Sequence, residues 1–292
     1  MKVAATGASG TIGSALVEEL RSRGDEVTVL SRRSEWPDPK DAPPPADTLR
    51  GRDAVVHLAG EPLAQRWTDD SKREIRDSRV LGTRNLVAAL RDLPEGERPS
   101  VLVSQSAVGY YGAHGDEEVD ESAAAGDDFL AQVVAEWEAE ALEASELGVR
   151  VVTPRTGVVL SSGGGALEKM LPPFKLGVGG PVAGGRQYVP WVHLDDVAGA
   201  MVFLLDRPDA SGPVNLTAPS PVTNGELSKT LGRVLRRPAV APVPGFAVKL
   251  LYGEMAMVVT TGQRAVPKRL EELGYEFRKP DLEDALRSAL DT

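Results

Sequence analysis

The first residues that suggest chemistry are three glycines near the amino terminus. They lie in the segment Thr6-Gly7-Ala8-Ser9-Gly10-Thr11-Ile12-Gly13, between a short apolar run at residues 3–5 and apolar residues at helical spacing. A glycine turn before a helix lets backbone N–H groups approach a pyrophosphate, and the helix dipole favours the bound anion. The spacing G-x-x-G-x-x-G differs from the common dehydrogenase spacing. It predicts a nucleotide-binding turn, the alternative being a tight strand-to-helix turn without a ligand.

A second group of polar residues, Ser31-Arg32-Arg33, follows the second predicted strand at residues 27–30. NAD-specific folds place an acid near this point to bind the ribose 2′-hydroxyl, whereas an arginine accommodates the 2′-phosphate of NADP. The first acid in this chain comes at Glu35. The pattern favours NADP(H) over NAD; the alternative is that one or both arginines only solvate a loop.

Alternating strands and helices must position these residues. Buried strands are predicted at 3–5, 27–30, 54–59, 101–104 and 149–153, with helices from Ile12, from Thr68 to about Leu90, and from about Asp127. The pattern predicts an α/β fold, a Rossmann doubly wound parallel sheet, with a proline-rich exposed loop at 34–50. We expect an NADP-binding Rossmann domain at 1–160, to which 189–217 returns, and a smaller mixed substrate subdomain at 161–292. There a capping box, Thr223 to Glu226, begins a helix.

Composition narrows the classes of protein. The chain has 292 residues, a net charge of −10, no cysteine and three histidines. The negative net charge argues against binding to nucleic acid or to an anionic membrane. The absence of cysteine and the small number of histidines argue against a metal site. No basic leader and no apolar run of spanning length is present. These features predict a soluble, cytoplasmic protein with a small-molecule substrate.

Further motifs carry a resemblance to a known family. They are His57-Leu58-Ala59-Gly60, the segment from Ser104 to Gly112, the segment from Pro154 to Leu160, the segment from Trp191 to Asp196, and the segment from Gln263 to Leu270. The chain resembles the extended and atypical short-chain dehydrogenases/reductases. Within them it is similar to the "epimerase family protein" group, which is NAD-dependent epimerase/dehydratase-like and ends in a C-terminal domain of unknown function. Such proteins commonly pair through two long helices per subunit, and both monomer and homodimer stay open here.

The resemblance also implies which residues contact NADP(H). These are Gly7, Ser9, Gly10, Thr11, Ile12, Gly13, Ser31, Arg32, Leu58, Ala59, Gly60, Glu74, Arg79 and Arg155. Arg79 and Arg155 have a structural ion pair as the alternative. His57 ends a buried strand, and we expect it to be packed and hydrogen-bonded beside the cofactor.

The chemistry of the family rests on a Tyr-x-x-x-Lys pair and a serine. Ser106 fits the serine by position, but Leu130 and Val134 stand where the tyrosine and lysine are expected. Tyr111, with its neighbour Tyr110, is the candidate replacement proton donor, packing being the alternative. His193 is a further candidate, because the nearby carboxylates of Asp195 and Asp196 would raise its pKa; alternatively this segment is structural, with an aspartate that caps a helix.

Two residues further along are candidate substrate contacts. Arg186, in the loop from Gly184 to Tyr188, suits an anionic substrate, the alternative being an exposed loop arginine; Trp191 is the second contact. The favoured function is an NADP-dependent oxidoreductase acting on a small carbonyl or alkene. A sensor that holds NADP(H) without turnover is the alternative. A nucleotide-sugar epimerase fits less well, because epimerisation needs the missing base.

Overall fold

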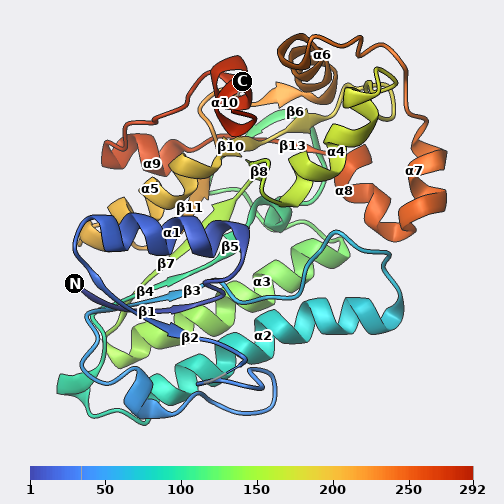
Figure 1. The fold of residues 1–292 in the computed structure, drawn as a ribbon. Helices are drawn as coiled ribbons and strands as arrows, with labels where there is room; N and C mark the ends of the chain where they lie inside the picture. Colours follow the sequence, from blue (N-terminus) through green and yellow to red (C-terminus); the bar gives the residue numbers. More distant parts are fainter. Residues whose placement is uncertain (34, 292) are drawn as a thin grey trace.

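A parallel sheet forms the centre of the fold (Figure 1). The computed structural model describes residues 1–33 and 35–291. Across the sheet the order is β2 (Glu26–Leu30), β1 (Lys2–Thr6), β3 (Ala54–His57), β4 (Val101–Ser104), β7 (Arg150–Thr156) and β11 (Gly212–Leu216), with β5 (Ser106–Ala107) also pairing with β7. Every pairing in this sheet is parallel. The predicted Rossmann-type α/β fold is confirmed.

Helices cover both faces of the sheet. On one face lie α1 (Thr11–Ser22) and α5 (Leu194–Asp206), and on the other α2 (Asp69–Arg91) and α3 (Phe129–Leu142) (Figure 1). Successive side chains of a strand point to opposite faces, so Val56 packs with the α1 layer and Val55 with the α2 layer. Both faces are apolar, as a sheet with helices on both sides requires.

The proline-rich segment is a largely exposed loop, as predicted, but part of it is buried. It contains one short 3₁₀ helix, η1 (Ala46–Thr48), and it buries Trp36 and Leu49 against the α2 layer. The Trp36 indole N–H donates to the carbonyl of Ala42 at 2.7 Å. Ser34 lies outside the described residues. Prolines indicated a loop correctly, but they carry no information about which apolar neighbours are buried.

The C-terminal half builds a second, smaller core above the carboxyl edge of the sheet. Helices α4 (Gly165–Lys175), α6 (Asn224–Leu235) and α10 (Leu282–Ala289) contribute to it. The predicted capping box of α6 is present, since Thr223 and Glu226 bond each other's backbone N–H. The remaining strands form small sheets: β8 (Val158–Leu160) with β10 (Trp191–His193), β9 (Tyr188–Val189) with β12 (Val222–Thr223), and β6 (His114–Val119) with β13 (Gln263–Ala265).

Short helical elements complete the chain. They are η2 (Glu95–Glu97), η3 (Val108–Tyr111), η4 (Glu143–Leu147), α7 (Gly245–Tyr252), η5 (Glu254–Ala256), α8 (Met257–Thr260) and α9 (Lys268–Leu273). Helix α9 places Leu270 and Leu273 in the core beneath α1 and α5, so the C-terminal residues 161–292 share that core with the Rossmann sheet.

Within the described part of the chain, no helix combines the length and the apolar character that a membrane span requires.

Candidate functional site

The order of the strands reverses direction between β1 and β3, and the candidate site lies there. In open α/β sheets, ligands bind at such a switch point, outside the carboxyl ends of the strands. Gly7 follows β1 and Leu58 follows β3. A Cβ atom on Gly7 would lie 2.6 Å from the carbonyl carbon of Leu58, and Gly7 has a φ of +68°. Only glycine fits this crossing of two backbones.

The start of α1 supplies the second part of the site. Gly10 precedes the helix without a side-chain cap, and its N–H donates to the carbonyl of Gly7 at 3.0 Å. A Cβ on Gly13 would lie 2.2 Å from that carbonyl oxygen. Uncapped first-turn N–H groups at a helix start form a site for an anion. Gly7 and Gly13 therefore leave no room for a side chain at this turn, and the binding of a nucleotide by the turn stays a prediction.

A buried hydrogen-bond network holds the segment after β3 in place. The Thr6 hydroxyl accepts from the backbone N–H groups of Leu58 (3.2 Å) and Ala59 (3.3 Å). With both lone pairs used, that hydroxyl donates its own proton to Nδ1 of His57, 2.7 Å away. Burial lowers the pKa of His57 to about 4, so the ring is neutral near pH 7. His57 is thus packed and hydrogen-bonded, as expected.

Arg79 brings a partly buried positive charge to the same segment. Its guanidinium lies 3.1 Å from the position of a Cβ on Gly60, donates to the carbonyl of Ile75 at 3.0 Å and lies over the Trp137 ring. Burial lowers the pKa of Arg79 to about 10, against the opposing charge of Glu61. Among the described residues, no carboxylate lies within ion-pair distance of it. A cation in this position suits an anionic ligand.

Three further residues that were predicted to contact the cofactor lie outside the glycine turn and the segment after β3. Ser31 and Arg32 lie directly after β2, with the Arg32 side chain exposed. The Glu74 carboxylate instead accepts two hydrogen bonds from Lys40, at 2.7 and 3.0 Å. This contact ties the proline-rich segment to α2, and a contact of Glu74 with the cofactor stays a prediction.

A buried polar network surrounds Ser106. Its hydroxyl donates to the Glu138 carboxylate at 2.5 Å, and Arg155 donates to both oxygens of that carboxylate at 2.8 Å. Arg155 also donates to the Tyr111 hydroxyl (3.0 Å), which donates to Oδ1 of Asn215 (2.6 Å). Although burial disfavours its charge, the hydrogen bonds and charge of Glu138 hold the pKa of Arg155 above its ordinary value.

This network bears on three predicted roles. Ser106 is fully buried and its proton is committed to Glu138, so it does not face a substrate. Tyr111 is 1% exposed, its hydroxyl donates to Asn215, and burial raises its pKa to about 12, so it is a core residue that does not face a substrate in this structure. Arg155 forms the ion pair that was weighed as the alternative, and its contact with the cofactor stays a prediction. Sequence analysis did not identify Glu138 as a member of this network. Glu138 lies one helical turn after Val134, but no local sequence pattern indicates that Arg155 is its partner.

Two other candidates also prove structural. His193 caps α5, where its Nδ1 accepts the N–H of Asp195 at 3.1 Å, and burial lowers its pKa despite both aspartates. The expected rise in pKa is therefore wrong, and a histidine takes the capping role expected of an aspartate. Trp191 is fully buried and its indole donates to the carbonyl of Ser220, so it has no surface for a substrate.

Tyr110 and Arg186 remain to be placed. The Arg155 guanidinium lies 3.5 Å from the ring centroid of Tyr110, which favours the packing interpretation of that half-buried tyrosine. Arg186 is exposed on its loop, and its contact with a substrate stays a prediction.

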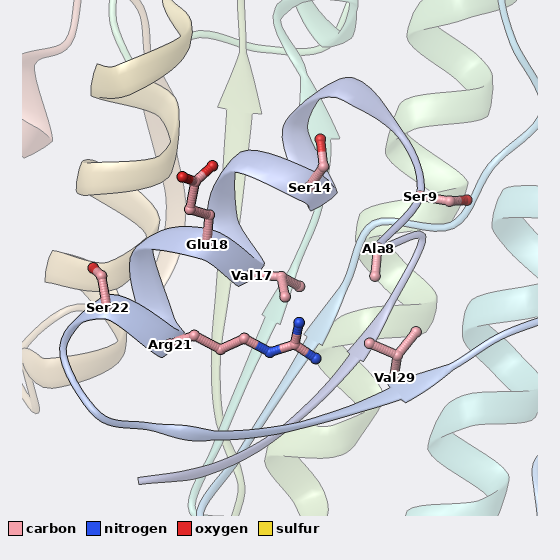
Figure 2. A pocket seen from close by; sticks show the side chains of 8 residues that line it. All are labelled: Ala8, Ser9, Ser14, Val17, Glu18, Arg21, Ser22 and Val29. Atoms are coloured by element: carbon pink, nitrogen blue, oxygen red, sulfur yellow. The ribbon is translucent and has the colours of Figure 1, made fainter.

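A surface hollow adjoins the site on its outer side. It has a volume of about 730 Å³ and lies between α1 and β2, where Arg21 extends toward Val29 (Figure 2). Ala8 and Ser9 are the residues of the glycine turn that line it. Most of its lining belongs to the flank of α1 beside the open edge of β2, so we place the candidate site at the switch point and not in this hollow.

Comparison with known proteins places the chain in a family. The NAD dependent epimerase/dehydratase family matches residues 3–216, and a domain of unknown function, DUF1731, matches residues 243–289. The chain belongs to the NAD dependent epimerase/dehydratase family. The predicted resemblance is confirmed, including its C-terminal domain.

Relatives within this family align over nearly the whole chain. Epimerase family protein SDR39U1 homolog, chloroplastic, from Arabidopsis thaliana is 43% identical, covering 99% of this chain and 87% of that protein. Human epimerase family protein SDR39U1 is 38% identical, covering 98% and 99%. The crystal structure of human SDR39U1 (isoform 2) with NADPH has a TM-score of 0.90 at 36% identity, covering all of both chains. UDP-glucose 4-epimerase from Thermus thermophilus, with NAD, shares the fold at 21% identity and a TM-score of 0.75.

Proposed function

We propose that this protein binds NADP(H) at the switch point and acts as an oxidoreductase on a small substrate with an activated alkene or a quinone. The observation that carries the binding proposal is the glycine cradle, in which Gly7 and Gly13 leave no room for a Cβ. The uncapped start of α1 and the partly buried cation of Arg79 support an anionic ligand beside it. The relative crystallised with NADPH supports the choice of dinucleotide.

The residues present fit such a cofactor. The turn from Gly7 to Gly13 and the N-terminus of α1 would hold the pyrophosphate, and Arg32 would pair with the 2′-phosphate. Leu58 and Ala59, held by Thr6, would form the opposite wall. A bound nicotinamide supplies or accepts a hydride.

The surroundings of Ser106 decide which substrate class we favour. Leu130 and Val134 carry no proton, and the hydroxyls of Ser106 and Tyr111 are committed to buried partners. General acid–base help contributes about 10²–10⁴ to a rate. An activated alkene or a quinone depends on it least, because the charge that hydride addition creates spreads over a conjugated oxygen and water can protonate the product. Sugar epimerisation needs a base at a hydroxyl and is disfavoured.

The hydrogen bonds of the Ser106 and Tyr111 hydroxyls to buried partners also favour a second function. A protein without an available proton donor can hold NADP(H) as a sensor and regulate a partner instead of turning over.

A single-turnover experiment separates the two functions. Protein preloaded with NADPH is mixed with ketones, aldehydes, enones and quinones, and loss of the reduced nicotinamide absorbance is followed. Stoichiometric oxidation by enones or quinones supports the oxidoreductase. Preference for simple ketones would contradict the substrate class, because those need a proton donor. Tight NADPH binding without oxidation by any compound would favour the sensor.

The cofactor assignment has its own test at Arg32. We expect Arg32→Ala to weaken NADPH binding by about 1–3 kcal/mol, the range for a hydrogen bond to a charged group, and to leave NADH binding nearly unchanged. Binding is measured by the nicotinamide fluorescence of each cofactor. Arg33→Ala is the matched control on the next residue. Equal losses for both cofactors in Arg32→Ala would contradict a contact with the 2′-phosphate.

A further inference from the structure

A layer of buried polar side chains lies between the central sheet and helices α2 and α3, and we call it the polar layer. It consists of five residues, each at most 4% exposed: His57, Thr83, Ser104, Trp137 and Thr153. Each has a buried polar side-chain atom that finds no hydrogen-bond partner in the described part of the chain. Buried polar atoms of native proteins are almost always hydrogen-bonded, so five of them in one layer require an explanation.

Three neighbouring strands supply one side of the polar layer. His57 of β3 pairs in register with Ser104 of β4. Thr153 continues the same row on β7, because the preceding residues of β4 and β7 are in register. Two residues earlier, each of these strands buries an aliphatic side chain in the α2 layer, and side chains two residues apart on a strand point to the same face. The three polar side chains therefore point toward α2 and α3.

The two helices, which lie side by side on this face, supply the other side (Figure 1). Thr83 lies one turn before Leu86 on α2. Trp137 lies one turn before Ala141 on α3. Leu86 and Ala141 belong to the apolar core of this face, and residues three or four apart lie on the same side of a helix. Thr83 and Trp137 therefore also face the sheet.

The hydrogen-bonding capacity of these groups defines the chemistry of an occupant. The Nδ1 atom of His57 accepts from the Thr6 hydroxyl, so the neutral ring carries its proton on Nε2. The indole nitrogen of Trp137 is also a donor only, whereas the three hydroxyls of the polar layer can donate and accept. The occupant must therefore accept from N–H groups and exchange hydrogen bonds with hydroxyls, as water does.

The spacing of the strands selects an occupant of the size of water. Neighbouring strands lie about 4.8 Å apart, and side chains in one row keep roughly that separation. Accordingly, no direct hydrogen bond joins the three strand side chains of the polar layer to one another within the described residues. One water molecule with two hydrogen bonds of about 2.8 Å each bridges such a gap.

Charge argues against an ion as the occupant. Burial lowers the pKa of His57 to about 4, so none of the five groups is charged near pH 7. An ion buried among uncharged groups loses hydration that these groups replace only in part.

We infer that internal water molecules occupy the polar layer and bridge the N–H groups of His57 and Trp137 to its hydroxyls. Globular proteins hold about one buried water per 27 residues, bonded to buried polar groups that have no other partner. The His57 ring holds the Thr6 hydroxyl, which in turn holds the backbone after β3, so these waters extend that network. The inference is independent of the cofactor and of the reaction proposed above.

Urea unfolding of two variants of the full chain tests the occupancy through the sign of the change. Thr83→Val replaces a fully buried hydroxyl by a methyl group of similar size, and Ser104→Ala removes a second hydroxyl. With water bound, each loses a hydrogen bond, and the equilibrium constant for unfolding should rise by about two- to tenfold. In a dry layer each would remove an unpaired hydroxyl, and the constant would fall.

Ser228→Ala is the matched control for Ser104→Ala. The Ser228 hydroxyl is also buried and has no hydrogen-bond partner among the described residues, but it lies on α6, away from the polar layer. This variant should not raise the equilibrium constant for unfolding.

A crystal structure of the wild-type chain is the direct test, and it decides the inference even if a variant fails to fold. We expect ordered waters within hydrogen-bond distance of the His57 Nε2 atom and of the Trp137 indole nitrogen. A dry layer, or direct hydrogen bonds among the five side chains, would overturn the inference. So would an anomalous signal in the layer after a bromide soak, which would assign it to an anion, or greater stability of both Thr83→Val and Ser104→Ala.

Discussion

The Glu138 carboxylate is the negative centre of the buried network around Ser106. The side chain of Arg155, its partner, is 3% exposed, and that of Glu138 is 8% exposed. Glu138→Ala would leave the guanidinium charged in the core, and breaking a buried pair in this way costs about 3–5 kcal/mol. Domains commonly unfold with a free energy of about 5–15 kcal/mol, so we expect a protein that is close to its limit of stability.

Two further variants separate the buried charge from a general effect of mutation. Arg84→Ala removes an ion pair with Glu140 in which the arginine side chain is 56% exposed, and such pairs contribute about 0–1 kcal/mol. The double variant Glu138→Leu/Arg155→Met removes both charges and fills the space with apolar atoms. Replacing a buried pair in this way is often neutral or stabilising, so the double variant should be more stable than Glu138→Ala.

Equilibrium unfolding in urea measures these differences, with tryptophan fluorescence as the signal. Trp137 precedes Glu138 on α3 and reports on this part of the core. A loss in Glu138→Ala as small as that in Arg84→Ala would refute the assignment of a buried ion pair. So would a double variant that is no more stable than the single one.

Three other changes test separate parts of the structure. The pKa of His57 falls from 6.5 to about 4 on burial. Between pH 4 and 6.5 the unfolded chain therefore binds more protons than the folded protein. The free energy of unfolding should fall by up to about 3 kcal/mol as the pH drops from 6.5 to 4. Urea titrations at several pH values should show a flatter dependence in His57→Asn. Gly13→Ala would press a Cβ against the carbonyl of Gly7, and calorimetric titration should show that affinity for NADPH is lost. Gly96→Ala, at an open position, is the control and should leave the NADPH affinity unchanged. Thr223→Ala removes the α6 capping box and should cost about 1 kcal/mol in urea unfolding; a loss below a few tenths would contradict the cap.

The sequence determined the Rossmann layers and the glycine turn because their signals are local. Buried strands and amphipathic helices can be predicted from the spacing of apolar residues over a short stretch of sequence. The turn between β1 and α1 requires glycine at fixed spacing. Gly7 and Gly13 lie where that reasoning placed them, each against backbone that leaves no room for a side chain. The N-cap of α6 at Thr223 is local in the same way.

Only the tertiary structure decided which polar residues are available for chemistry. Ser106 follows a strand at the position expected in the family, but its hydroxyl donates a hydrogen bond to Glu138, which comes 32 residues later. The Tyr111 hydroxyl likewise donates to Asn215, 104 residues later. The carboxylates beside His193 indicated a raised pKa, yet burial has the larger effect and lowers it. Exposure, pairing and pKa depend on what the rest of the chain packs against each side chain, and no local pattern encodes those distant neighbours.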